Sequence, residues 1–170
     1  MEGAAVSNID IYQNAAVLHV GEKKLSARLV LDAMGNGSPI TKQIRGPVEP
    51  DGICIVVGTC ARGFDQGNNT YSDLIYTDTP VTEVVEGKSQ QQYFWEAFPA
   101  GSGKTDRTSY LFTYLDAKPE RPSILEIMED YWRLLPRYQG KSIDELDVLR
   151  VLFGCFPTYR SSPLRAGFDR

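Results

Sequence analysis

Short stretches of apolar and β-branched residues, separated by polar and glycine-bearing segments, fill most of the chain before residue 116. Their length and alternation are typical of strands in a half-buried sheet. The first three follow one another closely and predict a small meander. The stretches that we expect to be strands are residues 9–12, 15–20, 25–31, 53–59, 73–77, 92–98 and 109–115.

A helical spacing of apolar residues begins only after this strand-rich part. Ser123 and Glu126 stand three residues apart, as in a capping box, and apolar residues then recur every three or four positions up to Leu135. Ser142 as an N-cap predicts a shorter helix over residues 143–149. Strands first and helices late predict an α+β or α/β piece without internal repeats.

Charge and composition then exclude several classes of function. Eighteen basic and twenty-two acidic residues give a net charge of −4, the wrong sign for a nucleic-acid partner. The apolar runs are too short to form a transmembrane segment. Cys54, Cys60 and Cys155 are interpreted as three buried thiols, and with His19 as the one histidine we expect no metal site.

The sequence Gly101-Ser102-Gly103-Lys104-Thr105 looks like the end of a phosphate-binding loop. Phe98 stands where that motif requires its first glycine, and an aromatic strand is expected after Thr105 instead of a helix. We therefore interpret residues 101–105 as a hairpin turn.

Aromatic residues gather in the two strands on either side of that turn. They could line a pocket for a long apolar ligand or form cross-strand pairs of a core, the more usual case. Glu96 shares a face of its strand with two of these aromatic residues. If that face is buried, the Glu96 carboxyl could donate a proton. We prefer the alternative, in which Glu96 is salt-bridged or exposed at a sheet edge. The aromatic residues are Tyr93, Phe94, Trp95, Phe98, Tyr110, Phe112 and Tyr114.

The most informative stretch is residues 29–35, Leu-Val-Leu-Asp-Ala-Met-Gly. Val30 makes the end of the expected strand, residues 25–31, apolar on both faces, as in a strand of a parallel sheet that is covered on both sides. Asp32 and Gly35 then place a carboxylate and an unhindered backbone at the strand's end, a common place to bind a nucleotide.

In this context the stretch up to Ser38 resembles the second half of the FAD-binding domain of hydroxylase-like flavoproteins, where a hairpin feeds a strand ending in Asp-Ala-x-Gly. Further stretches are similar to the CruP branch of lycopene cyclases of cyanobacteria and plants, and the resemblance covers nearly the whole chain. These further stretches are residues 50–54, 73–76, 92–99, 111–116 and 149–154.

The resemblance implies a partial Rossmann-type FAD domain and an antiparallel-sheet substrate domain with late helices. Its implied boundaries are residues 1–45 for the partial FAD-binding domain, 46–122 for the substrate-domain sheet and 123–170 for a helical segment returning to the FAD domain. The implied cofactor is FAD, and the implied activity is that of an oxidoreductase or isomerase of carotenoid metabolism. A carotenoid or other apolar small molecule, a plastid address and peripheral membrane contact are implied with it.

The resemblance also assigns roles to individual residues. Asp32, Ala33 and Gly35 match the segment that contacts FAD near its diphosphate. Related plant cyclases carry an acidic segment where this chain has Thr113 and Tyr114. We therefore keep Glu96 and Asp116 only as candidate acids for catalysis.

Two family segments do not occur in these 170 residues: an early Gly-x-Gly-x-x-Gly turn and a later Gly-Asp segment, expected beyond Arg170. We therefore expect a piece of a flavoprotein that is incomplete at both ends and, alone, inactive and unable to hold FAD firmly. The alternative is a truncated, non-catalytic protein or a binding module without FAD.

Overall fold

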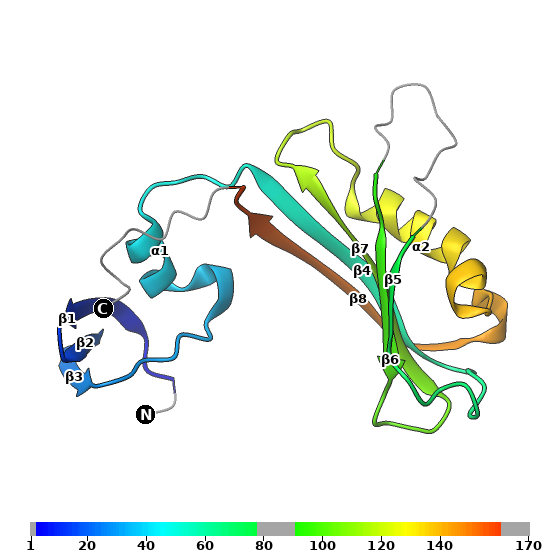
Figure 1. Ribbon diagram of the computed structural model, residues 1–170, viewed down its shortest axis with the longest axis horizontal. Coiled ribbons are helices and arrows are strands. Elements are labelled where there is room, and N and C mark those ends of the chain that lie inside the picture. The colour runs from blue at the N-terminus through cyan, green and yellow to red at the C-terminus, as the bar shows by residue number, and fades with distance from the viewer. Residues whose placement is uncertain (1–2, 78–90, 161–170) are drawn as a thin grey trace. The chain divides into compact units, whose positions relative to one another are not determined.

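The computed structural model describes residues 3–77 and 91–160. The chain divides into two compact units. Unit 1 consists of Met1–Pro50 with Tyr159–Arg170, and unit 2 consists of Asp51–Thr158. Each unit has its own antiparallel sheet (Figure 1).

Unit 1 contains the predicted meander of three strands, β1 (Val6–Tyr12), β2 (Ala15–Val20) and β3 (Lys23–Ala27), in that order. A short helix, α1 (Pro39–Arg45), which was not predicted, lies against β1. The Gln43 side chain accepts a hydrogen bond from the Ile9 nitrogen (3.0 Å) and donates one to the Ile9 oxygen (2.7 Å). It therefore ties helix to strand, with Ile9 and Ile40 buried beside it.

The prediction of a strand over residues 25–31 is wrong at its C-terminal end. Strand β3 stops at Ala27, and residues 29–31 form no ladder with any described strand. Leu29 and Leu31 are 74% and 84% exposed. The apolar pattern of these residues suits a covered strand, but the described residues provide no backbone partner that would satisfy it.

Unit 2 is a five-stranded antiparallel sheet in the order β5-β6-β7-β4-β8, with one long helix, α2 (Ile124–Gln139), on one face (Figure 1). Strand β4 begins beside the end of β8, where Gly52 pairs with Thr158. The strands are β4 (Gly52–Arg62), β5 (Asp73–Tyr76), β6 (Phe94–Pro99), β7 (Asp106–Asp116) and β8 (Asp147–Thr158).

The core of unit 2 lies between α2 and the sheet. The Trp95 ring stacks on Tyr131 with 5.0 Å between centroids, and its indole nitrogen donates to the Ser109 hydroxyl (2.9 Å). The predicted capping box is present, with Ser123 and Glu126 capping each other, so this helix begins where the sequence indicates. The fully buried apolar side chains of this core include Ile55, Val57, Leu111, Ile127 and Leu135.

The shorter helix predicted over residues 143–149 is wrong. The Ser142 cap closes a single 3₁₀ turn, Ile143–Glu145, and strand β8 begins at Asp147. Pairing with β4 along nearly the whole length of β8 outweighs the local helical signal, because each ladder bond satisfies a backbone group.

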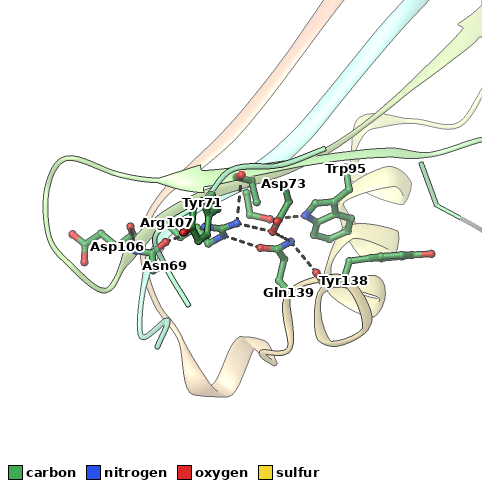
Figure 2. A network of polar contacts seen from close by, with 10 residues as sticks. Asn69, Tyr71, Asp73, Trp95, Asp106, Arg107, Tyr138 and Gln139 are labelled. Atoms are coloured by element: carbon green, nitrogen blue, oxygen red, sulfur yellow. Dashed lines mark hydrogen bonds and ion pairs between the residues drawn. The ribbon is translucent and has the colours of Figure 1, made fainter. Parts of the chain in front are cut away.

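A buried arginine ties the sheet to the end of α2 (Figure 2). The Arg107 guanidinium donates to Asp73 (2.6 Å), to the Asn69 side chain (3.0 Å) and to the Tyr71 carbonyl (3.0 Å). Its Nε donates to the Gln139 side chain (2.9 Å). This network fixes β5, β7 and the last turn of α2 to one another.

The α+β class and the antiparallel sheets agree with the sequence analysis, whereas the described residues contain no parallel sheet. Residues 101–105 do join β6 and β7 as a hairpin. The prediction of three buried thiols is confirmed for Cys54 only. Cys60 is half-buried, and Cys155 is exposed because β8 is an edge strand. Within the described residues, no helix is long and apolar enough to span a membrane.

Candidate functional site

The face of the unit 2 sheet opposite α2, here called the open face, carries a cluster of aromatic side chains. Strand alternation sends Tyr93 and Trp95 to the α2 side, where both are buried. The aromatic residues that are close together in the sequence are thus divided between the two faces of the sheet. The aromatic residues of the open face are Tyr76, Phe94, Phe98, Tyr110, Phe112, Tyr114 and Phe156.

The rings of the open face contact one another. Phe94 stacks on Phe112 at 5.3 Å, meets Tyr76 edge-on at 5.0 Å and meets Tyr114 edge-on at 5.9 Å. Such pairs hold ring positions and add stability beyond the burial of area. Tyr76 and Tyr114 are nevertheless 71% and 58% exposed. An exposed, preorganised aromatic patch of this kind is typical of a binding surface.

One carboxylate lies within this aromatic surface. Glu96 on β6 is directly opposite Tyr110 on β7, and the Tyr110 hydroxyl donates a hydrogen bond to the Glu96 carboxylate. Burial has the largest effect on the pKa of Tyr110, and together with the neighbouring Glu96 carboxylate it raises this pKa to about 12. The pair holds a proton on the tyrosine oxygen, and Glu96 has no ion-pair partner among the described residues.

Asp116, the second candidate acid, is not brought near Glu96. It ends β7 six residues beyond Tyr110, about 20 Å along the strand at the usual rise. Its carboxylate pairs with Lys118 at 3.3 Å. The two acids cannot therefore act on one reacting group, and a catalytic role for either stays a prediction.

The candidate cofactor residues of unit 1 form a loop around Asp32. One carboxylate oxygen accepts from the Met34 nitrogen (3.0 Å), and the other accepts from the hydroxyls of Ser38 and, at 3.3 Å, Thr41. These hydrogen bonds lower the pKa of Asp32, and the bond from Ser38 has the largest effect. Asp32 is therefore ionised at neutral pH and braces the turn that leads into α1.

Ala33 and Gly35 are exposed in this loop. Gly35 has φ +67°, a conformation that glycine adopts without strain, and a Cβ there would meet nothing within 4 Å. A carboxylate repels a diphosphate, so Asp32 can serve such a ligand only indirectly, by fixing the backbone that approaches it. The loop is open enough for that approach.

A pocket of about 980 Å³ adjoins Asp32 within unit 1. This is near the upper end of the usual range for small-molecule sites. Arg28 lies in its wall and makes no ion pair or hydrogen bond with another described residue. The wall thus combines apolar side chains with one available cation, Arg28, and with the Asp32 carboxylate, whose negative charge is engaged by its hydroxyl and backbone donors. The lining includes Ile9, Tyr12, Arg28, Leu29, Asp32 and Ile40.

Sequence reasoning missed the partners that give Asp32 its geometry. Ser38 is the N-cap of α1, accepting from the Thr41 nitrogen at 3.1 Å, and Pro39 occupies the first helical position. Serine followed by proline is a helix-start signal, so α1 could have been predicted. No comparable signal indicates that Tyr110 binds Glu96, because that pairing depends on strand register.

Comparisons with known proteins assign no family. No protein-family model matches the chain, and no curated protein matches it. Among solved structures, it is similar to the crystal structure of the halogenase PltM in complex with ethyl mercury and mercury, at 12% identity and a TM-score of 0.44. That similarity covers 93% of this chain, which spans about a third (32%) of the halogenase chain, and it is too low to assign a fold or a function.

Proposed function

We propose that this chain is part of an FAD-dependent flavoprotein of the oxidoreductase type, in which unit 1 contributes to cofactor binding. The observation that carries the proposal is the Asp32-braced loop beside the 980 Å³ pocket. FAD, when bound, would supply electron or hydride transfer. Arg28 suits its diphosphate, and the exposed backbone at Gly35 leaves room for it.

Unit 2 would provide the substrate-binding surface of the same protein. The open face offers an apolar, preorganised set of rings, with a single polar pair, Glu96 and Tyr110, in its midst. A lycopene-cyclase-like activity on a carotenoid is the finer form of the proposal, with Glu96 as the candidate acid. In its protonated form Glu96 would donate to the substrate, and Tyr110 would hold its carboxyl in place. A plastid location and peripheral membrane contact would follow from such a substrate.

The alternative is a binding module that needs no flavin. The observation that favours it is that the ring contacts of the open face are all made within unit 2. In that case an apolar ligand would bind equally well with or without FAD.

Flavin fluorescence quenching by the purified chain tests the cofactor role of unit 1. We expect weak but saturable FAD binding that Asp32→Ala weakens at least tenfold, because the loop loses its brace. Asp10→Ala is the matched control, since Asp10 is bonded to His19 (2.7 Å) and does not line the pocket. Equal affinities for the chain and the Asp32 variant, or no binding at all, would contradict the proposal.

A further inference from the structure

A second pocket, of about 530 Å³, lies at one end of the open face, within unit 2. Its wall combines two leucines, a thiol, two hydroxyls and one guanidinium. The residues that line it, apart from Gly101, are Cys60, Ser102, Thr108, Leu149, Arg150 and Leu152.

A bulge in β8 builds this wall. Cys60 of β4 pairs with Arg150, but the next residue, Ala61, pairs with Val148, so Leu149 is the extra residue. A bulge bends its strand and turns neighbouring side chains toward one side, and bulges are frequent beside binding sites. Here it allows Leu149 and Arg150, which are consecutive in sequence, to line the same pocket.

Arg150 is available to a ligand. It makes no hydrogen bond, ion pair or ring contact with another described residue, a property that it shares only with Arg28 among the described arginines. The nearby Asp106 carboxylate is already held by Arg62 at 2.8 and 3.0 Å and by the Ser102 hydroxyl. The pocket thus contains one uncompensated positive charge.

Apolar surface adjoins this charge, because Leu149 and Leu152 line the same pocket. Gly58 lies opposite Tyr110 on one side and Leu152 on the other, and a Cβ at Gly58 would collide with the backbone of Ser109 and Tyr110. β4 and β7 therefore approach closely at Gly58, where Tyr110 occupies the space that a side chain would need. Gly58 precedes Cys60 by two residues, about 7 Å along the strand.

We propose that this pocket binds an organic carboxylate with an apolar body. Arg150 and the Thr108 hydroxyl donate to the carboxylate, while the body lies against Leu149 and Leu152, which line the same pocket. One guanidinium matches a single negative charge, and the two leucines disfavour a strongly hydrated dianion such as phosphate. The inference rests on the proposed role of unit 2 as the substrate-binding surface and names the class of its ligand.

Isothermal titration of the full chain with decanoate tests the proposal, with acetate and decanol as probes that lack the body and the charge, respectively. We expect saturable binding of decanoate alone. Arg150→Gln should weaken it roughly 10- to 100-fold, the usual effect of losing charge-assisted hydrogen bonds. Arg150→Lys should restore part of the affinity, and Arg133→Gln, the matched control on α2 at the other face of the sheet, should leave it unchanged.

The proposal is overturned if Arg150→Gln binds decanoate as the parent chain does, if decanol binds equally well, or if Arg133→Gln weakens binding as much as Arg150→Gln does. Because Arg150 is exposed and unpaired, its variants should retain the tryptophan fluorescence of the folded chain. FAD binding is measured separately, so failure of the carboxylate site with FAD binding intact is distinguishable from failure of the proposed function.

Discussion

Replacing Arg107 by methionine should destabilise unit 2 strongly. The Arg107 side chain is only 6% exposed, and it donates to Asp73, Asn69 and Gln139 as well as to backbone carbonyls (Figure 2). Methionine fills similar space but leaves these acceptors without their donor. Asp73 remains 42% exposed and regains some hydration, so we expect the lower part of the usual 3–5 kcal/mol range for breaking a buried pair, about 3 kcal/mol.

The assay is urea unfolding followed by tryptophan fluorescence, because both tryptophans, Trp95 and Trp132, belong to unit 2. Arg133→Met is the matched control: Arg133 is 53% exposed and pairs with Asp130 at 2.7 Å, so its loss should cost less than about 1 kcal/mol. A free energy of unfolding for Arg107→Met within about 0.5 kcal/mol of the control would refute the structural role of the network.

Three further predictions concern the open face and the helix. The pKa of Tyr110 is raised to about 12 from an ordinary 10, so the stability that its neutral form contributes is fully present below pH 10 and is lost as the pH rises through 12. In urea unfolding, the difference in free energy of unfolding between the parent chain and Tyr110→Phe should therefore shrink between pH 10 and pH 12. Gly58→Ala should lower the free energy of unfolding by about 1–3 kcal/mol, because its Cβ meets backbone; an unchanged midpoint would disprove the close approach. Ser123→Ala should cost about 1 kcal/mol, whereas Ser72→Ala, at an exposed serine of unit 2, should cost almost nothing in the same assay.

The sequence predicted elements whose signals are local. The capping box at Ser123 located α2, and alternation located most strands to within a few residues. It failed where pairing decided the outcome, as at β8, where a helix start at Ser142 precedes a strand that β4 stabilises.

The candidate sites show the same division. Asp32 and the sharing of one face by Glu96, Phe94 and Phe98 could be predicted from local spacing, and the structure has them so arranged. The Tyr110–Glu96 bond and the pocket at Arg150 could not, because the first depends on the register of β6 and β7 and the second on the bulge in β8.

The pairing of Gly52 with Thr158 has a consequence for the architecture of the chain. Cross-strand partners have Cα atoms about 5 Å apart, so unit 2 begins and ends at neighbouring points of its own sheet. Such a segment behaves as a domain insertion: joining Pro50 to Tyr159 through a short glycine linker would close a gap of a few residues at little entropic cost. Residues 51–158 therefore form a transferable module, which could be lengthened, exchanged or circularly permuted while the host chain keeps its connectivity.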